Sequence, residues 1–134
     1  MLRMPKLSIA VASSVAALIL LSATTAVRAS TRGERFVSDS EKNLDELIVK
    51  LPSLADIKRV VADDCKAKTN RPDADAFCAC GAAITISLWR ADDTMRGRLT
   101  TYIANPSPTS ASEFVKYEGP ELYGPACAEA LGSH

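Results

Sequence analysis

The chain has 134 residues, with 16 lysines and arginines, 16 aspartates and glutamates and a single histidine. A chain without a large basic cluster is a poor candidate for nucleic-acid binding, which requires lysine and arginine gathered on one surface. The length allows one domain but not two.

The first 29 residues have the composition of a signal peptide. Residues 1–7 carry Arg3 and Lys6 and no acid, residues 8–26 are uncharged and largely apolar, and Val27-Arg28-Ala29 ends in the small residue that signal peptidase reads. The alternative is an uncleaved membrane anchor, which the serines and threonines of the apolar stretch disfavour. Cleavage there leaves about 105 residues, with 13 basic and 16 acidic side chains and a net charge of −3.

Four cysteines, Cys65, Cys78, Cys80 and Cys127, lie in the part expected to be exported. An even number of cysteines in an exported chain indicates disulfide bonds. A metal site is the weaker alternative, because the only histidine is His134 and zinc sites usually contain paired C-x2-4-C knuckles. We therefore expect two disulfides.

Two amphipathic helices are predicted after a polar, flexible segment over residues 30–39. The first helix starts at an N-cap, Ser40, and its apolar residues follow at spacings of three and four: Leu44, Leu47, Ile48 and Leu51. Pro52 ends this helix and fits the first turn of the next, whose apolar face carries Leu54, Ile57, Val61 and Cys65. Cys65 is therefore expected to point inward.

The segment over residues 66–73 has no apolar periodicity and is predicted to be the loop of a helical hairpin. The helix after it, over residues 74–90, has two apolar faces, which predicts that it lies at the centre of the domain. Asp92 or Asp93 can cap a fourth helix, which ends at Asn105-Pro106.

The C-terminal part is predicted to contain short elements separated by turns. A short helix is expected over residues 112–118, and Gly119-Pro120 and Gly124-Pro125 are each expected to end one helical turn and start another. Every periodic segment repeats at three to four residues. The sequence therefore predicts an all-α fold: a small bundle of four to five short helices stapled by two disulfides, forming a single domain over residues 40–134.

The positions of the cysteines favour one disulfide pairing. Residues two apart on a helix point about 200° from each other, so Cys78 and Cys80 should have different partners. Cys65 and Cys78 lie at similar heights above the hairpin loop, which favours Cys65–Cys78 and Cys80–Cys127; the exchanged pairs, Cys65–Cys80 and Cys78–Cys127, are the alternative. In the loop-entropy description, closing 13 residues contributes about 3 kcal/mol and closing 47 about 4 kcal/mol.

No catalytic site emerges from the sequence. A Ser-His-Asp or Cys-His site needs an imidazole, and the only one is His134 at the C-terminus. The paired carboxylates Asp63-Asp64 and Asp92-Asp93 point apart on a helix, and such pairs more often cap or solvate helix ends than catalyse. We expect no catalytic, cofactor-binding or metal-binding residues.

Five of the seven aromatic residues lie from residue 89 onward: Trp89, Tyr102, Phe114, Tyr117 and Tyr123. Trp89 and Phe114 are expected to belong to the core. Tyr117 and Tyr123 lie next to the Gly-Pro pairs and can belong either to the core or, with Asp92 and Asp93, to a candidate partner surface, because tyrosines anchor many interfaces.

Together these features predict a small exported protein-binding module, such as an inhibitor, an immunity protein or an envelope accessory protein, rather than an enzyme. The alternatives are a periplasmic chaperone or stress protein and a carboxylate-dependent hydrolase. The expected partner is another protein and not nucleic acid, and no stable membrane anchor is expected after signal cleavage. The Ala-rich signal and the lack of an N-x-S/T sequon favour a periplasmic or secreted protein of the bacterial envelope.

Overall fold

The computed structural model describes residues 32–132, and this part of the chain is all-helical, as predicted. The predicted signal peptide over residues 1–29 lies outside the described residues. Six α-helices and one 3-10 helix follow one another, with no strand in the described part: α2 (Arg32–Lys50), α3 (Leu54–Lys68), α4 (Ala74–Ala91), α5 (Asp93–Ala104), α6 (Pro108–Glu113), η1 (Phe114–Tyr117) and α7 (Pro120–Leu131).

The first helix, α2, is longer than predicted. It begins at Arg32, so residues 32–39 are helical turns and not a flexible segment. Val37 and Ser40 are buried together with Leu44, which extends the apolar spacing of three and four one turn towards the N-terminus. Ser40 is therefore an interior helical residue and not an N-cap. Phe36 and Val37 are the two large apolar residues in the segment 30–39 before it, and this adjacent pair has no helical spacing that would have predicted the turn.

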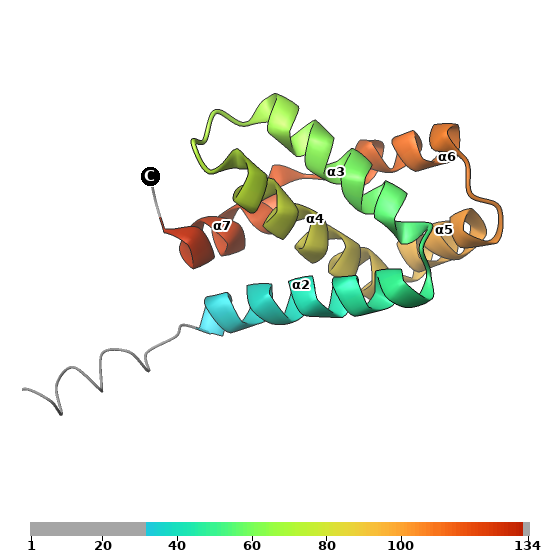
Figure 1. Ribbon diagram of the computed structural model, residues 1–134, viewed down its shortest axis with the longest axis horizontal. Coiled ribbons are helices and arrows are strands. Elements are labelled where there is room, and N and C mark those ends of the chain that lie inside the picture. Colours follow the sequence, from blue (N-terminus) through green and yellow to red (C-terminus); the bar gives the residue numbers. More distant parts are fainter. Residues whose placement is uncertain (1–31, 133–134) are drawn as a thin grey trace, which may run out of the picture. The chain divides into compact units, whose positions relative to one another are not determined.

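Helix α4 lies at the centre of the fold, as its two apolar faces predicted (Figure 1). It packs against α2, α3, α5 and α7, and nine of its residues are buried. Small residues in its middle, Gly81, Ala82 and Ala83, allow the neighbouring helices to approach closely. The added Cβ of an alanine at Gly81 would lie 2.8 Å from the Tyr123 ring, so this glycine is required for α7 to pack against α4.

Two hydrophobic clusters lie along α4. The larger is built by α2, α3, α4, α5 and α6 with η1, and its aromatic centre contains Trp89, Phe114 and Tyr102. The ring of Phe114 lies 5.6 Å from that of Trp89 and 5.8 Å from that of Tyr102, in tilted and edge-to-face arrangements that aromatic pairs favour. Trp89 and Phe114 are thus core residues, as predicted.

The smaller cluster surrounds the two disulfides and joins α7 to α2, α3 and α4. The pairs are Cys65–Cys78 and Cys80–Cys127, which confirms the favoured pairing. The Cα atoms of the two pairs are 5.6 and 5.9 Å apart, within the usual range for disulfides. The first bond closes the α3–α4 hairpin, and the second ties α7 to the central helix.

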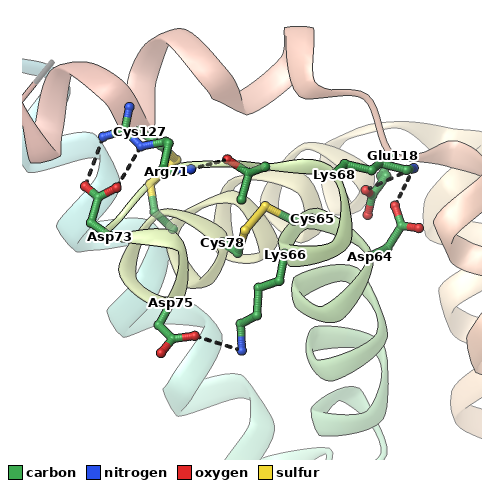
Figure 2. The surroundings of a disulfide bond; sticks show 12 residues. Asp64, Cys65, Lys66, Lys68, Arg71, Asp73, Asp75, Cys78, Glu118 and Cys127 are labelled. Atoms are coloured by element: carbon green, nitrogen blue, oxygen red, sulfur yellow. Dashed lines mark hydrogen bonds and ion pairs between the residues drawn. A yellow bond between two sulfur atoms is a disulfide. The ribbon is translucent and has the colours of Figure 1, made fainter. Parts of the chain in front are cut away.

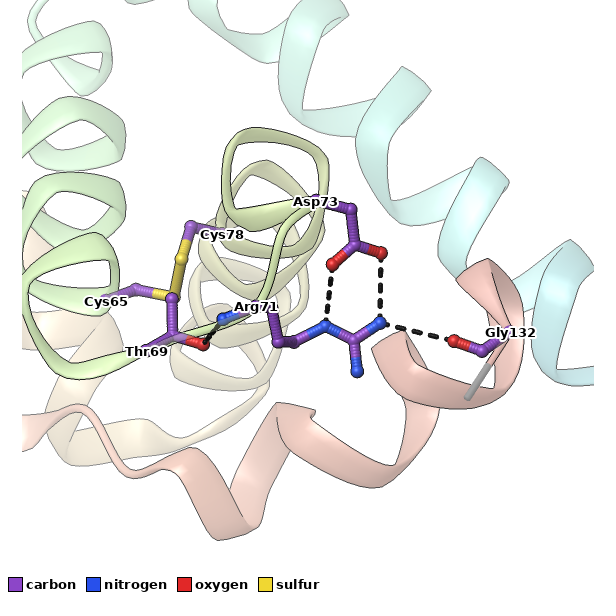
Figure 3. Close-up of polar contacts among 6 residues, drawn as sticks. All are labelled: Cys65, Thr69, Arg71, Asp73, Cys78 and Gly132. Carbon is purple, nitrogen blue, oxygen red and sulfur yellow. Dashed lines mark hydrogen bonds and ion pairs between the residues drawn. A yellow bond between two sulfur atoms is a disulfide. The ribbon is translucent and has the colours of Figure 1, made fainter. Parts of the chain in front are cut away.

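The loop between α3 and α4 is held by one arginine (Figure 3). The Arg71 guanidinium donates hydrogen bonds of 2.8 and 2.9 Å to Asp73 and one of 3.2 Å to the carbonyl oxygen of Gly132, just beyond α7. It also stacks on the ring of Phe77, 4.5 Å from its centroid. Arg71 therefore connects the hairpin loop to the end of α7.

The C-terminal elements differ from those predicted. The short helix predicted over residues 112–118 is α6, which begins at Pro108 after a Ser107 cap, followed by η1. Gly119 has an extended backbone and precedes Pro120, which is the first residue of α7. Gly124-Pro125 does not end the helix, because Pro125 lies inside α7. This proline removes one helical hydrogen bond, and burial of Tyr123 and Cys127 in the smaller cluster stabilises the helix against that loss.

Candidate functional site

A groove of about 680 Å³ lies between α5 and the α6–η1 segment. Its floor contains the aromatic rings of Tyr102 and Phe114, both buried in the larger cluster. The Tyr102 hydroxyl donates a 3.5 Å hydrogen bond to the Asp56 carboxylate of α3, and burial, followed by this carboxylate, raises the pKa of the phenol. The floor is thus part of the packed core and is rigid.

Polar residues stand on both walls of the groove. Helix α5 contributes Thr94, Arg98 and Thr101, and the opposite side contributes Glu113 and Tyr117. The Arg98 guanidinium lies over the Tyr117 ring, 4.6 Å from its centroid, in a cation–π contact that joins the two walls. Tyr117 remains 38% exposed, so part of its side chain is accessible beside a cation.

Gly97 opens the groove on the α5 side. It lies in the middle of a helix, where glycine is less favourable than alanine by roughly 0.5–1 kcal/mol. Packing gives no reason for it, because nothing lies within 4 Å of the position that a Cβ would take. A larger side chain at residue 97 would instead project into the groove.

The structure separates the four residues of the predicted partner surface. Tyr117 lines the groove. Asp92 caps α5 by accepting a 2.9 Å hydrogen bond from the Met95 amide, and Asp93, whose side chain is 92% exposed, pairs with Arg96. Neither aspartate lines the groove.

Of the two places considered for Tyr123, the structure contains the core position and not the partner surface. Its side chain is only 3% exposed and belongs to the smaller cluster, in edge-to-face contact with Phe77 and against Gly81. The physical reason is that Pro125 continues the helix instead of breaking it, so α7 presents Tyr123 and Cys127 to α4 on one face. Arg98 and Gly97, which sequence reasoning missed, form the groove with Tyr117 instead.

A second polar cluster that sequence reasoning missed lies where η1 leads into α7 (Figure 2). The side chain of Glu118 is 1% exposed, and the Lys68 ammonium lies 3.9 Å from its Oε1. Lys68 also forms an ion pair with Asp64. An isolated glutamate before a Gly-Pro pair carries no signal of burial in the sequence.

The pKa values of the Glu118 and Asp64 carboxyls are shifted in opposite directions. Burial, followed by the neighbouring Asp64, raises the pKa of Glu118 to about 8, whereas the neighbouring Glu118, followed by Lys68, lowers the pKa of Asp64. Neither oxygen of Glu118 makes a hydrogen bond of ordinary geometry within residues 32–132, so we assign the shift mainly to burial. Neither carboxyl lines the groove beside Tyr117 or any of three further surface pockets. The Glu118–Asp64 pair instead connects α3 to the residues just before α7.

Two buried disulfides indicate an oxidising, extracytoplasmic compartment. Among the described residues, no helix is long and apolar enough to span a bilayer. The same residues contain no group of three or more histidine, cysteine, aspartate or glutamate side chains that could hold a metal ion.

The chain was compared with protein-family models, curated proteins and solved structures. No family model, curated protein or solved structure matches it. A proposal for function therefore rests on the geometry of the groove and of the disulfides.

Proposed function

We propose that this chain is an exported protein-binding module and that the groove between α5 and α6–η1 receives an extended segment of its partner. The observation that carries this proposal is Gly97, which lowers helix stability, has no packing role and keeps the groove open. A residue that disfavours its own helix, and that gains no packing contact in return, is expected at a functional position.

The chemistry of the groove fits a peptide. Its volume of about 680 Å³ is in the range of pockets that enclose small ligands or a few side chains. The hydroxyls of Thr94 and Thr101 and the amide of Asn105 can exchange hydrogen bonds with a peptide backbone. Tyr117 and Arg98 are residue types that dominate the binding energy of many interfaces.

The disulfides and the Arg71 contacts support a role in protein binding. Both disulfides and the Arg71 contacts hold α3, α4 and α7 together, and the buried Tyr102 and Phe114 pack the groove against α3 and α4, so little conformational entropy is lost when a partner docks. The predicted signal peptide and the two disulfides support a location in the periplasm or outside the cell, which is part of this proposal.

Selection from a displayed library of random peptides tests the proposal, with the oxidised protein as bait. We expect enriched peptides that bind the parent and lose about tenfold or more in affinity with Gly97→Leu, because the leucine fills the groove. Ala67→Leu is the matched control: it adds the same side chain at an exposed helical position outside the groove and should leave affinity unchanged. No enrichment, or equal binding by the Gly97→Leu protein, would refute the proposal.

A further inference from the structure

A second pocket, of about 180 Å³, lies on another face of α5. Its lining differs from that of the groove, because most of it is aliphatic. The aliphatic side chains come from the end of α2 and the turn after it, from the start of α3 and from α5: Leu47, Leu51, Leu54, Leu99 and Ile103. The volume is below the roughly 300 Å³ of pockets that take drug-sized ligands, so a ligand here has a short apolar part.

Positive charge lines the same pocket. Arg90, in the last turn of α4, and Arg96, in the first turns of α5, are both lining residues, and no carboxylate is among them. The guanidinium of Arg90 makes no ion pair or hydrogen bond within residues 32–132. Arg96 bonds the Arg90 carbonyl oxygen at 3.4 Å and pairs with Asp93, an exposed contact that water screens strongly.

We propose that this pocket binds a short aliphatic carboxylate, with its chain among the leucines and its carboxylate on the Arg90 guanidinium. Charge complementarity selects an anion, because two guanidinium groups line the pocket without an acid. The planar fork of a guanidinium matches the two oxygens of a carboxylate. The aliphatic lining selects a hydrocarbon chain, and the small volume selects a short one, which identifies a short-chain fatty acid as the ligand.

Titration with hexanoate, followed by amide chemical shifts of the folded protein, tests this inference. We expect saturable shifts at the pocket residues with a Kd in the millimolar range, as suits a small pocket. Hexan-1-ol, which has the same chain without the charge, should bind about tenfold more weakly. Failure of hexanoate to shift these amides, or equal binding of the alcohol, would overturn the inference.

A paired substitution tests the role of the arginines. Arg90→Gln with Arg96→Gln should weaken hexanoate binding about tenfold or more, while Arg59→Gln, at an exposed site outside this pocket, should leave it unchanged. Unchanged Trp89 fluorescence checks that the double variant is folded. Hexanoate binding that survives the double substitution would contradict the inference, and none of these results depends on the peptide-binding proposal, which concerns a different groove.

Discussion

Replacing Glu118 with glutamine should change how stability depends on pH. The pKa of Glu118 is raised from its ordinary 4.5 to about 8, so between these values the folded chain holds a proton that the unfolded chain has lost. Stability must therefore fall as pH rises through this window, by up to about 1.4 kcal/mol per pH unit, and this contribution is flat below and above it. Asp64 acts in the opposite sense at lower pH: its pKa is lowered from 3.8, so its stabilisation is present above 3.8 and lost as pH falls through the folded value.

The size of the effect follows from the burial of the carboxyl. Over the roughly three pH units from 5 to 8, Glu118 should cost about 2–4 kcal/mol, and the pKa of about 8 already contains the opposing effect of Lys68. Glutamine has nearly the same shape and does not ionise. Glu118→Gln should therefore remove the slope and leave the protein more stable than the parent at pH 8 by a similar amount.

Urea unfolding at pH 5, 6, 7 and 8, followed by the fluorescence of the buried Trp89, measures this difference. Glu113→Gln is the matched control, because its carboxylate is exposed and should leave the slope of the parent unchanged. A parent protein whose stability is constant from pH 5 to 8, or a glutamine variant that keeps the parent's slope, would refute the reasoning.

Three further predictions follow from the packing and the disulfides. Gly81→Ala should destabilise the fold by about 1–3 kcal/mol, because the added Cβ would meet the Tyr123 ring. Gly97→Ala, whose Cβ would lie in open space, should stabilise the fold by roughly 0.5–1 kcal/mol. Thermal unfolding of both variants measures these changes, and a stabilising effect of Gly81→Ala would contradict the packing of α7 against α4. Cys127→Ser should open α7 while the α3–α4 hairpin stays folded, seen as new protease cleavage between residues 119 and 127, and global unfolding or unchanged protection of α7 would argue against a separately tethered helix. Intact mass of the exported protein should show cleavage near Ala29 and the hydrogen loss of two disulfides, which four free thiols would disprove.

The spacing of apolar residues and cysteines along the sequence was sufficient to predict the α3–α4 hairpin and the disulfide pairing. The apolar residues of α3 recur at three and four, so the inward position of Cys65 followed from helical pitch alone. The 200° angle between Cys78 and Cys80 excluded a mutual bond, and the height of Cys65 above the hairpin loop favoured the pairing that the structure contains.

The remaining features depend on contacts between distant segments. Pro125 indicated a break, and its tolerance inside α7 comes from burial of Tyr123 and Cys127 against α4. The depth of Glu118 depends on where η1 places the chain against α3, which no local pattern encodes. Gly97 was one of six single glycines, and its place in the lining of the groove, which distinguishes it from the others, exists only in the folded chain.

The most direct test of the account is photocrosslinking in cells that export the protein, with a photoreactive phenylalanine analogue in place of Tyr117. We predict a covalent adduct with a partner protein at this position, and its loss when Gly97→Leu fills the groove. The same analogue at Val49, an exposed apolar residue of α2 away from the groove, should give no adduct. An adduct of equal yield at Val49, or one at Tyr117 that persists with Gly97→Leu, would contradict the assignment of the groove as the docking site.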